Sequence, residues 1–246
     1  MLYKEYRKEK FVMFNLFKPV FIWCFAVGSL SGHACFAESL ADRGDSDAQY
    51  KLGVRYLEGD GVERSAEKAV MLFRKAAERG HAAAQNGLGV CYDNGEGVGK
   101  SAEQAVLWYR RSAEQGYAVA QCNLGLCYAN GDGVEKSAER AVLWYRRSAE
   151  QGYAAAQNSL GLCYANGEGV EKSAERAVQW YRKSAEQGNA VAQFNLGWCY
   201  ANGEGVEKSA EKAVMWYRRS AEQGDADAQN ILGLCYANGE GVEKSA

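Results

Sequence analysis

Residues 153–188 read YAAAQNSLGLCYANGEGVEKSAERAVQWYRKSAEQG, and most of the chain consists of variants of this stretch. Residues 117–152 are identical to it at 30 of 36 positions. Self-similarity at a fixed period indicates a repeat architecture. The period of 36 residues divides the chain into five full units and one partial unit, namely 45–80, 81–116, 117–152, 153–188, 189–224 and 225–246.

Each unit is predicted to form two helices. The first, residues 154–166 in the quoted unit, carries Ala156, Leu160, Cys163 and Tyr164 at the three-and-four spacing of an apolar helical stripe. A Gly-Glu-Gly segment then interrupts the helix, and Ser173 is a suitable N-cap for the second helix. No stretch of the repeats alternates apolar and polar residues as a half-buried strand does.

A helix pair of this size cannot bury its apolar face alone, but stacked neighbours can. The repeats therefore predict an all-α fold, a right-handed α-solenoid of helix-turn-helix units. The glycine at the ninth position of each unit, Gly161 in the quoted one, is expected to let the two helices of a pair approach closely.

The repeat pattern is A-x-x-x-L-G-x-x-Y-x-x-G-x-G-V followed by A-V-x-W-Y-R-x-S-A-E-x-G, and it resembles the Sel1-like repeat, a relative of the tetratricopeptide repeat. Within one unit the matching residues are Ala156, Leu160, Gly161, Tyr164, Gly167, Gly169, Val170, Ala177, Trp180, Tyr181, Ala185 and Gly188. The resemblance implies an α-solenoid that holds other proteins, as adaptors in membrane-linked degradation and signalling do, or as secreted bacterial proteins that meet host factors do.

The first 37 residues have a different composition from the repeats. A basic region is followed by the apolar run VFIWCFAV at 20–27 and by small residues that end at Ala37. This order is typical of a secretory signal peptide, so we expect 1–37 to be cleaved and the mature protein to be secreted or periplasmic. The alternative is an uncleaved N-terminal segment that anchors the chain in a membrane. Residues 38–44 resemble the end of a repeat and are expected to cap the solenoid.

Charge argues against nucleic-acid binding. The whole chain has a net charge of −2. Residues 1–37 hold five basic and two acidic residues, so without them the net charge is about −5. An acidic chain lacks the electrostatic footprint of a nucleic-acid-binding protein. Nothing in the repeats indicates a small-molecule cofactor, and we predict no metal site.

Six cysteines follow the signal segment, and five of them recur at the 36-residue period. They are Cys91, Cys122, Cys127, Cys163, Cys199 and Cys235. Cys122 and Cys127 are five residues apart on one helix, roughly 8 Å between Cα atoms, which exceeds the bridging distance of a disulfide. We therefore predict no regular disulfide ladder and interpret the series as small buried hydrophobic residues.

Two units contain the sequence S-x-x-K, the nucleophile motif of serine β-lactamases and penicillin-binding proteins. These are Ser65 with Lys68 and Ser209 with Lys212. Cysteine-rich members of the Sel1-like family have been linked to penicillin binding, so a β-lactamase-like hydrolase is the alternative function. The companion motifs are absent, and the other units carry the serine without the lysine. We therefore interpret these serines as helix caps and predict no catalytic residue.

Positions that vary between near-identical units mark either ligand recognition or sequence drift. On the first helices, the face away from the apolar stripe is expected to line the concave surface. Phe194 and Trp198 form an i,i+4 pair there, which we expect to be an exposed aromatic anchor for a protein or peptide. Packing against the adjacent helix is the alternative interpretation. The concave-face candidates are Tyr50, Asn158, Phe194, Trp198 and Asn230.

Two further expectations concern charged side chains and chain ends. The basic pairs of the second helices, such as Arg146-Arg147, precede an i+4 glutamate and are expected to form modest ion pairs. The asparagines at the end of the first helices are predicted either to contact a partner or to act as C-caps. The last unit holds only a first helix and the start of a second, so the chain is expected either to be a shortened product or to associate with another copy through this uncapped end.

Together these features predict a non-enzymatic scaffold that binds a protein or peptide on its concave face. A purely structural envelope spacer is the remaining alternative.

Overall fold

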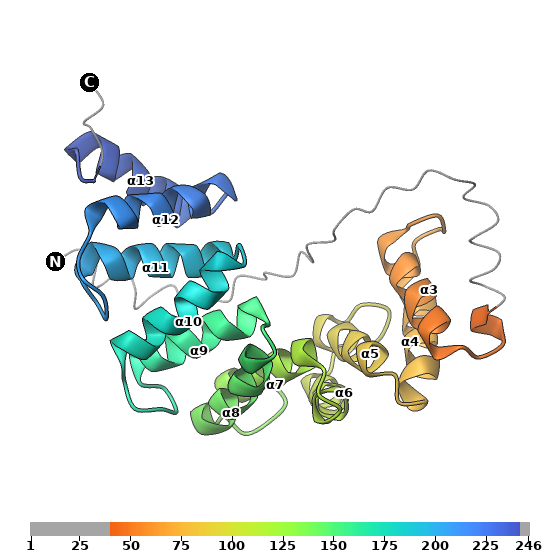
Figure 1. The fold of residues 1–246 in the computed structure, drawn as a ribbon. Helices are drawn as coiled ribbons and strands as arrows, with labels where there is room; N and C mark the ends of the chain where they lie inside the picture. Colours follow the sequence, from red (N-terminus) through yellow and green to blue (C-terminus); the bar gives the residue numbers. More distant parts are fainter. Residues whose placement is uncertain (1–39, 242–246) are drawn as a thin grey trace.

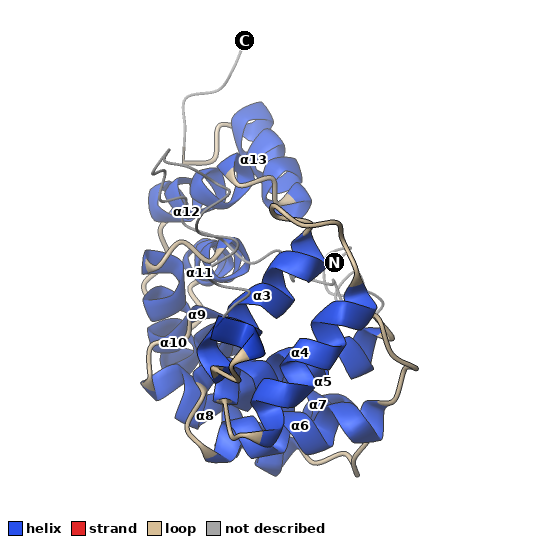
Figure 2. Cartoon of the chain, turned by 90° about the vertical axis from the view of Figure 1, so that its right-hand side faces the viewer, coloured by secondary structure: helices blue, strands red, loops and turns tan. Residues whose placement is uncertain are grey.

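The computed structural model describes residues 40–241, and in that range the chain consists of helices joined by loops and turns, without strands (Figure 2). The helices alternate as first and second members of pairs, and the pairs follow one another along an open curve (Figure 1). Their bounds are α3 Ser46–Glu58, α4 Ala66–Glu78, α5 Ala82–Asn94, α6 Ala102–Glu114, α7 Ala118–Asn130, α8 Ala138–Glu150, α9 Ala154–Asn166, α10 Ala174–Glu186, α11 Ala190–Asn202, α12 Ala210–Glu222 and α13 Ala226–Asn238. The predicted all-α solenoid is confirmed.

Hydrogen bonds at the helix ends explain why every unit folds alike. Each second helix begins after a serine whose Oγ accepts the backbone N–H three residues later, at 3.2 Å from Arg176 N to Ser173 Oγ. This confirms the predicted caps. First helices end at a glycine in the left-handed region, such as Gly167 at φ 77°. The predicted C-cap role of the asparagines is wrong, because this glycine takes the position and Asn166 is the last helical residue.

The two helices of a pair cross at the ninth-position glycine. A Cβ on Gly161 would lie 2.6 Å from the Tyr181 ring of the paired helix, a distance that real Cβ atoms do not reach. Because the glycine has no side chain, the ring can pack directly against the first helix, and Tyr181 is only 1% exposed. The predicted close approach is confirmed, and the atoms that require it belong to an aromatic ring.

The core is continuous from one unit to the next. Its largest cluster combines alanines, leucines, cysteines and tyrosines of α6 to α12. Leu88, Leu124, Leu160 and Leu196 occupy the same register in successive first helices, and each is 0% exposed. Four of the first helices, α5, α7, α9 and α11, are each covered by their own second helix and by the second helix of the preceding unit.

The N-terminal end of the described range continues the same pattern. The side-chain amide of Gln49 donates to the backbone oxygen of Ala41 over 3.0 Å, as that of Gln85 does to Ala77 one unit later. Residues 40–44 thus take the place that the end of a second helix takes elsewhere. The predicted signal peptide at 1–37 lies outside the described residues. Between residues 40 and 241, none of the helices combines the length and the apolar composition needed to cross a membrane.

Candidate functional site

The sixth residues of the first helices are largely part of the packing. Asn158 is 9% exposed, and its side-chain oxygen accepts a hydrogen bond from the Asn195 amide over 3.0 Å. An equivalent bond, also 3.0 Å, joins Asn123 to Asn86. The expectation that Asn158 faces solvent is therefore wrong, because its amide links two neighbouring first helices. Asn230, in α13, is exposed as expected.

The predicted aromatic pair is partly buried rather than exposed. Phe194 packs against Tyr217 of the paired helix, with 5.6 Å between ring centroids. Trp198 lies one turn further along α11 and is also partly buried. Tyr50 stacks on the His81 ring at 5.2 Å and contacts Phe73. The Phe194 ring therefore packs against the adjacent helix, as the alternative interpretation predicted.

A row of apolar side chains remains accessible one turn beyond the sixth position. It consists of the tenth residues of the units, which we call the first-helix row: Val54, Val90, Leu126, Leu162, Trp198 and Leu234. Leu126 is 38% exposed and Leu234 is 56% exposed, while the other four are partly buried. In the first-helix row, Trp198 is the one aromatic member.

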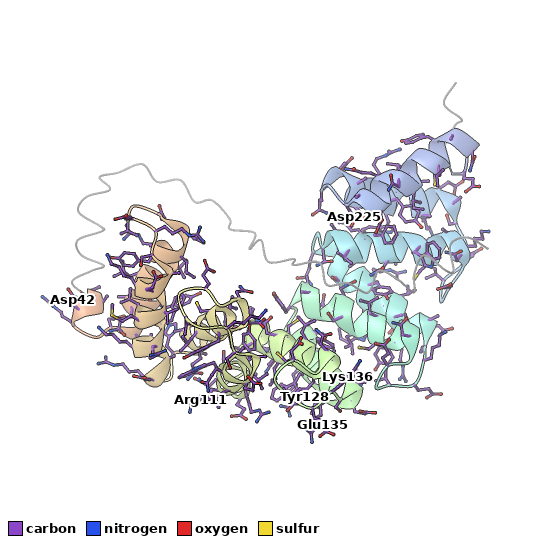
Figure 3. All side chains as sticks on the ribbon, turned by 180° about the vertical axis from the view of Figure 1, so that it is seen from behind. Asp42, Arg111, Tyr128, Glu135, Lys136 and Asp225 are labelled. Atoms are coloured by element: carbon purple, nitrogen blue, oxygen red, sulfur yellow. The ribbon has the colours of Figure 1, made fainter. Side chains whose placement is uncertain are left out.

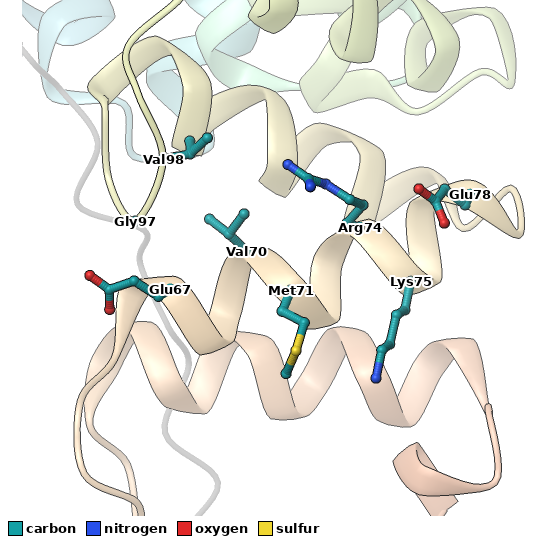
Figure 4. Close-up of a pocket in the computed structure, with 8 residues that line it drawn as sticks. All are labelled: Glu67, Val70, Met71, Arg74, Lys75, Glu78, Gly97 and Val98. Atoms are coloured by element: carbon teal, nitrogen blue, oxygen red, sulfur yellow. The ribbon is translucent and has the colours of Figure 1, made fainter.

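The second helices carry an accessible row that the sequence reasoning missed. We call it the second-helix row: Met71, Leu107, Leu143 and Met215 occupy the same position of their units and are 39–51% exposed. Beside Met71, a shallow groove of about 380 Å³ is lined by Val70, Met71 and Val98, with charged residues at its ends (Figure 4). The signal was present in the sequence as a fixed apolar register, which Gln179 interrupts in the fourth unit.

The basic pairs do not form the expected ion pairs. Arg146 donates from its guanidinium to the Tyr164 hydroxyl over 3.2 Å, and Arg147 stacks over the Trp144 ring at 4.6 Å. The same two contacts recur along the array, as at Arg111, which lies on the outer side of the curve (Figure 3). In the described range, the ion pairs are confined to residues 47–96. Stacking on a ring and bonding to a hydroxyl hold these arginines in place, so the i+4 glutamates are not needed.

The six cysteines of the described residues are buried free thiols. Burial raises the pKa of the Cys91, Cys122, Cys127 and Cys163 thiols to about 12. The thiolate is the reactive form of cysteine, so these side chains are poor nucleophiles near neutral pH. Their interpretation as small buried hydrophobic residues agrees with this placement. Residues 40–241 contain no group of three or more potential metal ligands.

The serines of the S-x-x-K sequences act as helix caps. Ser65 Oγ accepts the backbone N–H of Lys68 and also bonds to the Glu67 carboxylate over 3.1 Å. The Lys68 ammonium lies 5.2 Å above the Tyr56 ring, and Lys212 lies over the Tyr200 ring in the same way. Each lysine is thus held by a tyrosine of the preceding helix. This arrangement does not favour a serine nucleophile activated by lysine.

His81 has a structural role that the sequence reasoning missed. Its Nδ1 accepts the backbone N–H of Ala84 over 3.1 Å and caps α5. Asp45, Asn189 and Asp225 do the same for their own first helices, whereas Tyr117 and Tyr153 form no such bond. This position therefore varies between units because an aspartate, an asparagine or a histidine can cap the helix there.

Stacked helix pairs with a shared core define the class of protein, an α-helical repeat solenoid. The chain belongs to the Sel1 repeat family, whose repeat matches residues 46–81, 82–117, 118–153, 154–189, 190–225 and 226–246. Sel1 repeat folds are generally protein–protein interaction scaffolds.

Solved structures support the assignment. The chain is similar to c5321, a protective antigen of uropathogenic Escherichia coli with an SLR fold, at 40% identity and a TM-score of 0.79 over 85% of this chain and 45% of the antigen. It therefore spans about half the length of that relative. A Sel1 repeat protein of Oxalobacter formigenes has 41% identity and a TM-score of 0.77, covering 82% of this chain and 81% of its own. A Klebsiella pneumoniae protein at 22% identity shares the fold, with a TM-score of 0.55 over 81% of this chain and 97% of its own. No curated protein matches the chain.

Proposed function

We propose that the chain is a non-enzymatic scaffold that binds a protein or peptide along the concave face formed by its first helices. The observation that carries this proposal is the first-helix row, which runs through every unit with apolar side chains that remain partly or largely accessible. A row of this kind suits a partner whose apolar side chains have the same spacing as successive repeat units. Trp198 is its expected anchor, because buried tryptophans contribute most to interface energies.

The surrounding residues support an extended contact rather than a single pocket. Leu126 and Leu162 lead to Trp198 through consecutive first helices, and the buried Asn158–Asn195 pair fixes the helices that carry them. The first-helix row is thus attached to a rigid framework, which lowers the entropy lost on binding. Tyr50 and Asn230 lie in the end units and would extend the contact in both directions.

The test is recovery of a partner from the native compartment by the immobilised wild-type protein and by Trp198→Ala. If Trp198 is the anchor, its truncation removes at least 2 kcal/mol, or about a 30-fold loss of affinity. Phe194→Ala serves as a second variant, but its effect on stability must be measured separately because the ring packs on Tyr217.

The matched control is Leu143→Ala, which truncates an exposed apolar side chain of the second-helix row. This control should recover the partner as well as the wild type does. Equal recovery by wild type and Trp198→Ala would reject the first-helix row as the binding surface. Equal losses for Trp198→Ala and Leu143→Ala would show that recovery depends on apolar surface of any kind.

We further propose that the protein acts outside the cytoplasm, in secreted or periplasmic form. The support is the order of basic, apolar and small residues in 1–37. The mass of the protein recovered from its producing cells tests this proposal. A mature N-terminus near residue 38 is expected, whereas retention of residues 1–37 in the membrane fraction would favour the anchored alternative.

A further inference from the structure

Four cationic side chains of the second helices are held in place by aromatic rings alone. The guanidinium groups of Arg111, Arg147 and Arg219 stack over the tryptophan three residues earlier, at 4.6–4.7 Å from the ring centroid. The Lys183 ammonium lies over the Trp180 ring at 4.3 Å. Within residues 40–241, none of these four side chains forms a hydrogen bond or an ion pair. We call Arg111, Arg147, Lys183 and Arg219 the stacked cation row.

Stacking orients each guanidinium group and leaves its hydrogen-bonding edge open. The N–H groups of arginine lie in the plane of the guanidinium, whereas an aromatic ring contacts its face. A carboxylate can therefore approach the edge and accept two parallel hydrogen bonds. The residues of the stacked cation row are exposed, so this edge is accessible. Because stacking already restricts the side chain, less conformational entropy is lost on binding than with a mobile arginine.

An exposed apolar side chain lies one helical turn before each stacked arginine. Leu107 precedes Arg111 by four residues, a spacing that places both side chains on one face of α6. Helices α8 and α12 repeat this arrangement with members of the second-helix row. In the first unit, Arg74 and Lys75 line the same groove as Met71 (Figure 4). The second helices thus present apolar and cationic side chains next to one another.

Charge is distributed unevenly over the solenoid. Helices α4, α6, α8, α10 and α12 contain 14 basic and 10 acidic residues, a net charge of +4. Residues 40–241 contain 23 basic and 27 acidic residues, a net charge of −4, so everything outside these helices carries −8. The acidic residues of each second helix lie in its first and last turns, such as Glu139 and Glu150 in α8. The middle of each second helix is therefore cationic and attracts acidic groups, whereas the remaining surface repels them.

We propose that the stacked cation row and the second-helix row together bind an acidic segment of another protein, in which carboxylates alternate with apolar side chains. This partner differs from the one proposed for the concave face, because Arg111 lies on the outer side of the curve (Figure 3). Nucleic acid fits less well. The tryptophan rings are already stacked with cations, and Trp108 and Trp216 are only 8% and 7% exposed, which leaves little ring surface for a base. A planar membrane also fits less well, because it would touch only part of a convex array.

The probes are two labelled peptides that differ only in charge, one built from Glu-Leu-Ser repeats and the other from Lys-Leu-Ser repeats. An extended peptide advances about 3.3 Å per residue, so each repeat spans about 10 Å, the approximate width of one helix. Binding to the full chain is measured by fluorescence anisotropy at low and at high ionic strength. We expect the acidic peptide to bind and the basic peptide not to bind. Salt should weaken the binding, because it screens exposed charges.

The decisive variant combines Arg111→Gln, Arg147→Gln and Arg219→Gln. It removes three charges of the stacked cation row, and we expect it to bind the acidic peptide at least tenfold more weakly. These residues are exposed, so the variant should remain folded, which circular dichroism and urea denaturation check. The matched control removes the same charge from the same three units by replacing exposed loop lysines: Lys100→Gln, Lys136→Gln and Lys208→Gln. This control should bind the acidic peptide nearly as the wild type does.

Saturable, salt-sensitive binding that is lost in the arginine variant and kept in the lysine control supports the proposal. Absence of binding to the wild type would overturn it, as would equal losses in the two variants, which would show that only net charge matters. Binding of anionic phospholipid vesicles without binding of the acidic peptide would overturn it in favour of a membrane surface. Self-association of the wild type in sedimentation that is abolished in the arginine variant would overturn it in favour of a second copy. The concave face is separate from these residues, so failure here leaves the proposed function unaffected.

Discussion

Helices α11 and α13 have closely related sequences but differ in what surrounds them. Leu196 of α11 is 0% exposed, whereas its counterpart in α13, Leu232, is partly exposed. A Cβ on Gly197 would lie 2.8 Å from the Tyr217 ring, whereas a Cβ on Gly233 would meet no neighbouring atom within 4 Å. Because the two helices carry the same stripe, the difference in burial comes from the neighbouring helices alone. Stability in this fold is thus a property of the interfaces between helices.

Truncation of the shared leucine is the strongest test of this comparison. Leu196→Ala should lower the free energy of unfolding by about 2–5 kcal/mol, because it leaves a cavity in a closed core. Leu232→Ala should have a clearly smaller effect, since part of its side chain already contacts solvent. Urea denaturation of both variants checks this difference. Equal losses would mean that α13 is as well packed as α11.

Replacement by alanine should change the stability of the protein in opposite directions at two of the ninth-position glycines, Gly197 and Gly233. Gly197→Ala forces a methyl group against the Tyr217 ring, and overpacking of this kind typically costs about 1–3 kcal/mol. Gly233→Ala meets open space, and the better helix propensity of alanine should stabilise α13 by about 0.5–1 kcal/mol. Thermal unfolding of the two variants measures both effects. A loss of stability in Gly233→Ala would show that its surface is covered in solution.

The same contrast explains which predictions from sequence were accurate. The 36-residue period, the serine caps and the ninth-position glycines are local signals, and each was confirmed. The burial of Phe194 and of Asn158 depends on residues of a neighbouring helix, namely Tyr217 and Asn195. Helical periodicity distinguishes the faces of a helix but does not show which of them a neighbour covers. For the same reason the arginines were expected to pair with glutamates of their own helix, although they contact rings and hydroxyls.

The rates at which cysteine thiols are labelled also distinguish a helix packed on two sides from α13. Burial raises the pKa of both Cys163 and Cys235, so both should react slowly in the folded protein. Helix α9 is packed on two sides, whereas α13 has a described neighbour on one side only. Local opening should therefore expose Cys235 more often. We expect at least tenfold faster labelling of Cys235 by a disulfide reagent, followed by peptide mass spectrometry. Equal rates for the two thiols would contradict the idea that α13 opens independently.

The smallest effect concerns helix caps, which do not depend on the neighbouring unit. The pKa of Glu175 is lowered by its backbone hydrogen bond and by the Ser173 hydroxyl, and Glu67, Glu103 and Glu139 are affected in the same way. A carboxyl with a lowered pKa in the folded state stabilises the protein above its ordinary pKa of 4.5. That contribution is lost as the pH falls from 4.5 through the lower folded-state value.

Urea midpoints of wild type and Glu175→Gln, measured at pH 7 and at pH 3, test this contribution. The wild type should be slightly more stable at pH 7, because an acid in the first turn favours the helix only while it is ionised. The difference should narrow at pH 3, where the carboxyl is increasingly protonated. Ser173→Ala removes the hydroxyl donor and should weaken the pH dependence that Glu175 contributes. A difference between wild type and Glu175→Gln that stays constant across this range would mean that the carboxylate charge does not stabilise the cap.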